Sequence, residues 1–144
     1  MKTVILKHSF LFVVGGFIYC MIEMLFRNHT HFSMFVVGGL CFLLCGLLNE
    51  VFSWDMLIWN QMLVCALIIT VIEYVAGMVL NVWLGLGVWD YSNMPLNYKG
   101  QICLLFSLGW YFLSAVAIVL DDYLRYILFD EEEPRYILWR KKKC

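Results

Sequence analysis

The chain has 144 residues, of which 63% are hydrophobic and only 15% are charged, and its net charge at pH 7 is −1. Soluble domains average about 45–50% apolar and about 25% charged residues, and a chain this short has too little interior to bury the excess. The composition therefore excludes a water-soluble enzyme, a nucleic-acid-binding domain and a disordered chain. It predicts a single all-α, polytopic membrane protein whose apolar surface faces the lipid bilayer.

Four apolar runs are long enough to cross the hydrocarbon core as helices, for which about 20 residues are needed. They cover roughly residues 9–26, 32–48, 62–84 and 101–120. The short polar connection at 27–31 predicts that the first two helices are antiparallel neighbours. Both contain FVVGG, at residues 12–16 and 35–39. We interpret the glycines as points where two helix backbones approach closely; an inverted transporter repeat is the alternative.

Two further segments flank the third span. Residues 50–61 are apolar with two tryptophans, and we expect them to lie in the membrane interface or to extend the third helix. Residues 84–100 form the longest loop, in which Gly85, Gly87 and Pro95 prevent a continuous helix. This loop is dense in aromatic and hydrogen-bonding side chains. It either folds on itself or forms a lid or part of a ligand site.

Basic residues predict the orientation. Four spans place both termini on one side, and eight of the ten Lys and Arg residues collect there, whereas the other side has only Arg27 and Lys99. The positive-inside rule then predicts a cell-membrane protein with both termini in the cytoplasm and an outward-facing loop between helices three and four. Residues 1–120 would form the transmembrane domain, and residues 121–144 a charged cytoplasmic tail that continues helix four. The basic end of this tail either binds the inner leaflet or only anchors the topology.

The cysteines and histidines carry little chemistry. Five of the six cysteines lie in or beside apolar runs and form no Cys-x-x-Cys pair, which favours buried free thiols over a disulfide framework. His29 and His31 lack further ligands, so we expect no metal site and no cofactor. The chain has no phosphate-binding Gly-rich loop of the Walker type and no evident nucleophile. It is therefore not expected to be an ATPase itself, and a role other than catalysis is favoured.

Two carboxylates interrupt the apolar runs, Glu23 near the outer end of helix one and Glu73 near the middle of helix three. A charge in the hydrocarbon core costs about 2.5–3.5 kcal/mol, so each is expected to have a role. Glu23 either pairs with Arg27, four residues later, or joins a site. Glu73 either accepts an interhelical hydrogen bond, from Thr70, the Asn81 region or a tyrosine hydroxyl, or it binds a substrate, ion or proton.

Both carboxylates and the long loop lie toward the same predicted side of the membrane. We therefore predict a pocket at that side, with Glu73 in the bundle interior facing Glu23 or the loop. The candidate substrate-binding residues are Glu23, Glu73, Trp89, Asp90, Tyr91 and Asn97.

Residues 70–110 contain four short motifs: a Thr-x-x-Glu-Tyr segment, a Trp-Asp-Tyr-Ser segment, a Pro-x-Asn-x-x-Gly segment and an Ile-Cys-Leu run. They are formed by Thr70, Glu73 and Tyr74; Trp89, Asp90, Tyr91 and Ser92; Pro95, Asn97 and Gly100; and Ile102, Cys103 and Leu104. Through these motifs the chain resembles the bacterial family described as putative ABC-transporter type IV, or CmpB-like membrane proteins. Gly16, Tyr19 and Glu23 are similar to the family's first helix. The resemblance implies a permease-like role.

We therefore expect a small integral membrane protein that resembles a permease or transporter component. Four helices are too few to enclose a pathway for a sizeable solute, so we expect a homo-oligomer or a partner such as a separate ATPase subunit. Two alternatives remain open. One is an interaction or regulatory subunit whose charged tail makes the contact. The other is a membrane-embedded enzyme that acts on a lipid-linked substrate through Glu23, Glu73 and Asp90.

Overall fold

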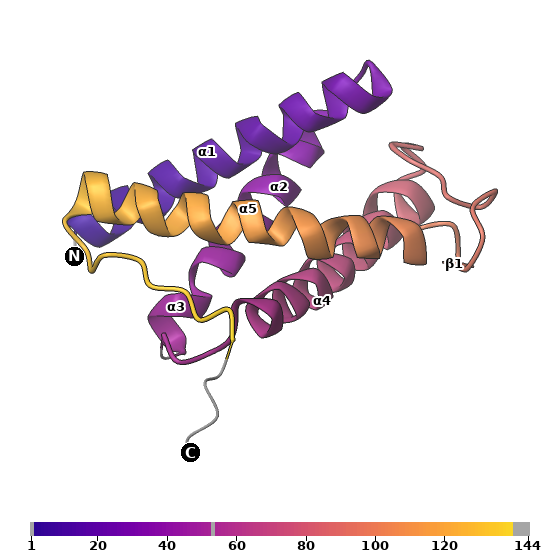
Figure 1. The fold of residues 1–144 in the computed structure, drawn as a ribbon. Helices are drawn as coiled ribbons and strands as arrows, with labels where there is room; N and C mark the ends of the chain where they lie inside the picture. Colours follow the sequence, from indigo (N-terminus) through magenta and orange to yellow (C-terminus); the bar gives the residue numbers. More distant parts are fainter. Residues whose placement is uncertain (1, 53, 140–144) are drawn as a thin grey trace.

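The computed structural model describes residues 2–52 and 54–139 (Figure 1). The fold is all-α, as predicted, apart from a two-stranded antiparallel hairpin in the long loop. The elements are α1 (Lys2–Arg27), α2 (Phe32–Gly46), α3 (Leu48–Val51), α4 (Ile58–Gly77), the π-helix η1 (Met78–Trp83), β1 (Asn97–Tyr98), β2 (Ile102–Cys103) and α5 (Leu104–Phe129).

Four segments of the described chain are long and apolar enough to cross a membrane, which confirms the predicted number of spans. They are Thr3–Arg27, Phe32–Val51, Ile58–Trp83 and Leu104–Phe129. The first segment begins well before Ser9, so its predicted bounds were too narrow at that point. The helix of the fourth segment continues well beyond Leu120, in agreement with the prediction that the following residues continue helix four. Lys7 and Asp121 lie inside these continuous helices and are paired there.

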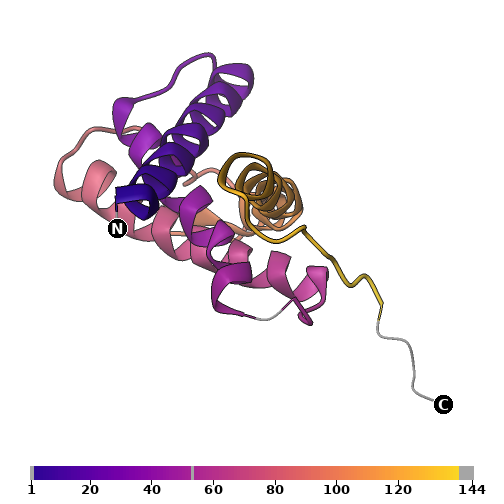
Figure 2. The ribbon, with the colours of Figure 1, turned by 90° about the vertical axis from the view of Figure 1, so that its left-hand side faces the viewer.

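The two ends of the bundle differ in character. The start of α1, the short helix α3 and the end of α5 gather at one end, which we call the termini end, and residues 84–103 cover the other, the loop end (Figure 1). Figure 2 views the molecule from the termini end, with α5 seen nearly end-on beside α1. There the rings of Phe10 and Phe129 lie 5.9 Å apart, and Lys7 Nζ donates to Glu131 Oε1 at 2.5 Å. Both ends of the helical chain therefore lie together, as an even number of spans requires.

Helices α1 and α2 form an antiparallel hairpin that packs through glycine. A Cβ atom at Gly39 would lie 2.6 Å from the backbone carbonyl oxygen of Phe12, and one at Gly16 would lie 2.7 Å from that of Phe35. Neither position has room for a side chain, because the obstructing atoms belong to the opposite backbone. The close approach predicted from the repeated FVVGG sequence is therefore present.

The larger part of the core lies between α2, α4 and α5. Its buried residues are Cys41, Cys45, Leu48, Ile58, Met62, Cys65, Ile69 and Ile118. The cysteines act there as small apolar side chains. In the described residues, five cysteines (20, 41, 45, 65 and 103) are free thiols, which confirms the prediction that they form no disulfide framework.

The termini end holds a network of buried charges. Asp121, Asp122 and Arg125 are 0%, 5% and 2% exposed. Arg125 Nε donates to Asp121 Oδ2 at 2.5 Å, and its Nη1 pairs with Glu50 of α3. The Tyr136 hydroxyl donates to Asp122 at 2.8 Å. Asp122 and Arg125 therefore tie α5 to α3 and to the segment that follows α5.

The segment after Pro134 lies along the start of α4. Leu57 and Ile137 form a parallel β-bridge, and Trp59 Nε1 donates to the Leu138 carbonyl at 3.0 Å. Residue 52 and residues 54–57 are not helical, and the helix begins at Ile58 rather than at Met62, so part of the 50–61 segment does extend the third span. The basic end of the tail, residues 140–144, lies outside the described residues.

Candidate functional site

The long loop folds on itself through its own polar side chains. Asp90 Oδ1 accepts hydrogen bonds from the backbone N–H of Ser92 at 2.8 Å and from its hydroxyl at 2.5 Å. These two donors hold the pKa of the Asp90 carboxyl below its usual range, so the group is charged at neutral pH. The Asn97 side chain donates to the Met94 carbonyl at 2.8 Å and accepts from the Gly100 N–H at 3.0 Å. Asn97 therefore closes the turn.

A second set of hydrogen bonds fixes the loop to α1 and η1. The buried Trp89 donates through Nε1 to the Gln101 carbonyl at 2.9 Å. Asn81 of η1 accepts from the Val88 N–H at 2.7 Å, and Arg27 Nη2 donates to the Val88 carbonyl at 2.6 Å. Irregular backbone at membrane depth needs such internal partners. The loop is thus held over the ends of α1 and α4 as a fixed cover.

Glu73 links three segments that are distant in sequence. It is 4% exposed and accepts from the Tyr91 hydroxyl at 3.1 Å and from Trp110 Nε1 at 3.0 Å. Burial and the nearby Glu73 carboxylate raise the pKa of Tyr91, which keeps this hydroxyl protonated as a donor. The prediction that Glu73 lies in the interior and faces the loop is confirmed. Of the expected partners, the tyrosine hydroxyl is the one that binds, while Thr70 and Asn81 bond elsewhere.

Glu23 forms the ion pair that its spacing to Arg27 predicted. Arg27 Nη1 donates to Glu23 Oε1 at 3.0 Å, and the Thr30 hydroxyl donates to Oε2 at 2.8 Å. The carboxylate is buried while the guanidinium is partly exposed. Both carboxylate oxygens of Glu23 therefore have partners. Among the described residues, Arg27 is the only basic side chain that forms an ion pair with Glu23.

A cavity of about 510 Å³ opens at the loop end between α1, the loop and α5. Four of the six predicted site residues line it, namely Glu23, Trp89, Asp90 and Tyr91. Glu73 lies behind its wall, hydrogen-bonded to two lining side chains, and Asn97 does not line it. The remaining lining residues are Tyr19, Ile22, Phe26, Arg27, Met94, Phe106, Gly109, Trp110 and Leu113.

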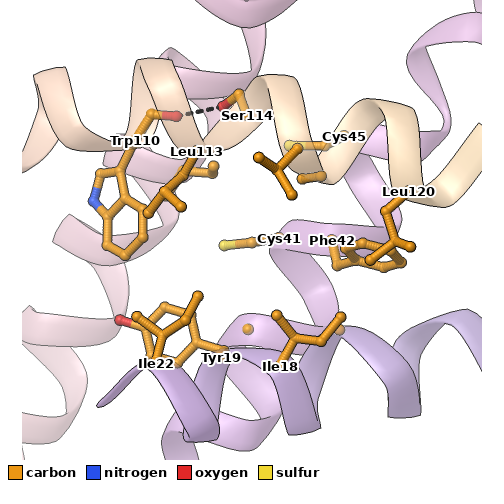
Figure 3. Close-up of a pocket in the computed structure, with 15 residues that line it drawn as sticks. Ile18, Tyr19, Ile22, Cys41, Phe42, Cys45, Trp110, Leu113, Ser114 and Leu120 are labelled. Atoms are coloured by element: carbon orange, nitrogen blue, oxygen red, sulfur yellow. Dashed lines mark hydrogen bonds between the residues drawn. The ribbon is translucent and has the colours of Figure 1, made fainter. Parts of the chain in front are cut away.

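A smaller apolar cavity of about 100 Å³ lies deeper, between α1, α2 and α5 (Figure 3). The two cavities share four lining residues: Tyr19, Ile22, Trp110 and Leu113. Figure 3 shows Trp110 on α5 opposite Tyr19 on α1, and their stacked rings lie 5.8 Å apart. The hollow between α1 and α5 therefore continues from the loop end into the bundle past this stacked pair.

The sequence did not identify Trp110 and Arg125 as important side chains, and Tyr19 stood out only in the Gly16, Tyr19 and Glu23 pattern of the first helix. Trp110 and Tyr19 meet across the hollow, but nothing in the sequence singles out one aromatic residue among many as the partner of another 91 positions away. A weak signal existed for Tyr19, which lies four residues before Glu23 and so shares its helix face. Arg125 also carried a signal, because Asp121 lies one turn before it.

Comparison with known proteins identifies the family. No solved structure matches the chain. The sequence model of a membrane-protein family, putative ABC-transporter type IV, matches residues 6–130, a range that contains every residue lining the loop-end cavity. The match covers most of the chain, from the first turns of α1 to the end of α5. The chain therefore belongs to the putative ABC-transporter type IV family.

Proposed function

We propose that this protein is the membrane-embedded component of a transporter and that the loop-end cavity is its solute-binding site. Family membership and four membrane-spanning segments support a transporter-like component. The observation that carries the site assignment is the position of Glu73. It is buried in a span, has no basic side chain within ion-pair distance among the described residues, and is bonded to two residues of the cavity wall. Intramembrane carboxylates in such positions commonly serve substrates or coupling ions.

The shape of the hollow supports this role. It lies at the loop end and continues past Tyr19 and Trp110, while at the termini end Phe10 packs against Phe129 and Lys7 pairs with Glu131. Alternating access requires a site open to one side and closed to the other. In our proposal, the α1–α2 hairpin rocks against the α4–α5 pair, because α1 packs mainly on α2 while α5 packs mainly on α4.

The distribution of basic residues supports an orientation in the membrane, and the walls of the loop-end cavity support the need for a partner. With eight of ten basic residues on the termini side, we place the termini in the cytoplasm and the cavity toward the outside of a cell membrane. The cavity has walls from α1, the loop and α5 only, so a closed pathway requires a second copy or another membrane subunit. Since the sequence has no phosphate-binding loop of the Walker type, ATP-driven transport would need a separate ATPase subunit.

The test compares the solutes that cells accumulate. Cells that lack the protein are supplied with wild type, Glu73→Gln or the control Glu133→Gln, at equal amounts in the membrane, and small molecules inside and outside are profiled by mass spectrometry. Glu133 is exposed and lies outside the bundle, so its substitution should behave as wild type. We expect a set of solutes whose distribution changes with wild type and with Glu133→Gln but not with Glu73→Gln. Identical solute profiles in these three strains and in the strain that lacks the protein would refute the proposal.

A second candidate is an enzyme that acts on a lipid-linked substrate. It is favoured by one observation: Glu23 and Asp90 line, and Glu73 adjoins, a cavity at membrane depth. Against it, each of the three carboxylates already accepts two hydrogen bonds. Lipid extracts of the same strains separate the two candidates. A lipid product present with wild type and absent with Glu73→Gln would favour the enzyme, and unchanged lipids would exclude it.

A further inference from the structure

The loop-end cavity has walls rich in aromatic rings from all three segments that form it. These rings belong to Tyr19, Phe26, Trp89, Tyr91, Phe106 and Trp110. Two stacked pairs fix their positions: Tyr19 and Trp110 at 5.8 Å, and Tyr91 and Phe106 at 4.6 Å between ring centroids. The faces of aromatic rings carry partial negative charge and attract cations, with Trp and Tyr the strongest. Such a wall favours an organic cation over an anion.

The charged side chains around the cavity also favour a cation over an anion. Three carboxylates line or adjoin it, and Arg27 is its only basic lining residue in the described chain. Arg27 is already bound to Glu23 at 3.0 Å. Glu73 and Asp90 have no basic side chain within ion-pair distance among the residues described. The cavity therefore carries an excess of negative charge, which a cationic ligand would neutralise and an anionic ligand would not.

Glu73 acts on the cavity through its wall. The Tyr91 hydroxyl and Trp110 Nε1 both donate to its two oxygens. A donor bonded to a carboxylate is polarised, and the electron density of its ring rises. The rings of Tyr91 and Trp110 are thereby made more attractive to a cation. Glu73 is in this sense a positioning and polarising residue and does not itself line the cavity.

The depth of the hollow sets the size and polarity of the ligand. Beyond the Tyr19–Trp110 pair the second cavity is lined by apolar side chains and by Cys41, Cys45 and Ser114, and the Ser114 hydroxyl is already bonded to the Trp110 carbonyl (Figure 3). An inorganic cation needs several oxygen ligands, which this wall does not offer. A ligand with an apolar body could extend into the hollow while its charge remains among the aromatic rings.

We propose that the cavity between α1, the loop and α5 binds lipophilic organic cations. Their charged centre lies against Tyr19, Tyr91 and Trp110, near Glu23 and Asp90, and their apolar body points along the hollow between α1 and α5. This proposal rests on the proposed function and narrows it to a substrate class.

The test uses two probes of the same shape and opposite charge. The full-length protein is placed in nanodiscs of zwitterionic lipid, and equilibrium dialysis measures binding of tetraphenylphosphonium and of tetraphenylborate, with empty nanodiscs as the background. We expect saturable binding of tetraphenylphosphonium and only background uptake of tetraphenylborate. Saturable binding of tetraphenylborate, or no saturable binding of tetraphenylphosphonium, would overturn the proposal.

Variants distinguish a site from general adhesion. Glu73→Gln should weaken tetraphenylphosphonium binding at least about tenfold, the size of one lost interaction with a charged group. Asp90→Asn keeps an oxygen that can accept the Ser92 hydrogen bonds and should weaken binding about threefold, since solvent screens the charge at this exposed position. Glu133→Gln should bind as wild type. A merely structural role of Glu73 would lower the melting temperature without changing the ratio of the two probes. Unchanged affinity in both Glu73→Gln and Asp90→Asn would overturn the proposal.

The two proposals can fail separately. Solute profiles that depend on Glu73, together with no binding of tetraphenylphosphonium, would leave a transporter whose substrate is not an organic cation, and this inference would be wrong. Saturable, Glu73-dependent binding together with solute profiles that never change would support the cation site and refute the transport function.

Discussion

A single carboxylate, Glu73, connects α4, the loop and α5. Its two oxygens are bound by Tyr91 and Trp110, which lie 18 and 37 positions further along the chain. A side chain that joins three segments in this way stabilises their arrangement and, in our proposal, also tunes the cavity. The structural role needs a hydrogen-bonding side chain at position 73, whereas the role in binding needs its negative charge. Different substitutions therefore separate the two roles.

The first prediction separates them. Glu73→Leu leaves the Tyr91 hydroxyl and the Trp110 N–H without an acceptor and should lower the free energy of unfolding by about 1–2 kcal/mol, the size expected for hydrogen bonds in a bundle. Glu73→Gln keeps one acceptor oxygen for the Trp110 N–H, and its amide NH2 can donate to the Tyr91 hydroxyl, so it should unfold close to wild type yet lose solute and cation binding. Equilibrium unfolding in detergent measures the first effect. If Glu73→Leu is as stable as wild type, these hydrogen bonds do not support the fold.

Arg125 is the corresponding residue at the termini end. It is buried between Asp121 and Glu50, and removal of one member of a buried ion pair costs about 3–5 kcal/mol because a charge is left without a partner. We predict that Arg125→Leu lowers the free energy of unfolding by this amount. Adding Asp121→Asn should restore part of it, because the Asp121 charge that was left without a partner is then removed. The same unfolding measurement applies. A single variant within about 1 kcal/mol of wild type would show that the pair is not structural.

Among the elements, the α1–α2 hairpin is the most tightly packed. A Cβ atom at Gly39 would lie 2.6 Å from a backbone oxygen of α1, whereas one at Gly109 in α5 would meet nothing within 4 Å. We predict that Gly39→Ala destabilises by about 1–3 kcal/mol because the helices must move apart. The matched control Gly109→Ala should be neutral or stabilise by about 0.5–1 kcal/mol, since alanine favours helix. Equal melting temperatures for the two variants would contradict this packing.

The spans were predictable because each excess of apolar residues can be read directly from the sequence. Their bounds were less predictable. Lys7 lies before the predicted start of the first span, but its charge is paired with Glu50 and Glu131 from distant segments, which the sequence does not reveal. Asp121 lies after the predicted end of the fourth span and is paired with Arg125, one turn later in the same helix. The π-helix η1 also has no signature in the sequence. It arises where α4 adjusts to the loop, as Asn81 is drawn to Val88 and Gln101.

For the whole molecule, the orientation in the membrane is the next prediction. Asn93 lies exposed in the loop, and Glu133 lies exposed beyond α5. In intact cells, a membrane-impermeant maleimide should label Asn93→Cys in a background without Cys144, and should label Glu133→Cys only after the membrane is permeabilised. The physical reason is the excess of basic residues on the termini side. The opposite labelling pattern would show that the predicted orientation is wrong and that the cavity faces the cytoplasm.

The candidate site was predictable only in part. Glu23 and Glu73 stood out because a charge in a span is costly, and their convergence with the loop followed from the directions of the helices. The pairing of Tyr19 with Trp110 was not predictable, because aromatic residues are abundant in every span and only the tertiary packing selects two of them. Asn97 does not line the cavity and closes a turn of the loop, and the sequence could not reveal this because an amide that closes a turn looks the same in a sequence as one that binds a ligand.

The central claim is that a solute binds in the hollow between α1, the loop and α5. The most direct measurement is a crystal structure of the protein bound to tetraphenylarsonium, from crystals grown in lipid. The anomalous signal of arsenic locates the bound cation. We predict an arsenic peak inside the loop-end cavity, beside Tyr19 and Trp110, with Glu73 still bonded behind the wall. An empty cavity with arsenic bound elsewhere, or Glu73 directed into the lipid without a polar partner, would contradict the account.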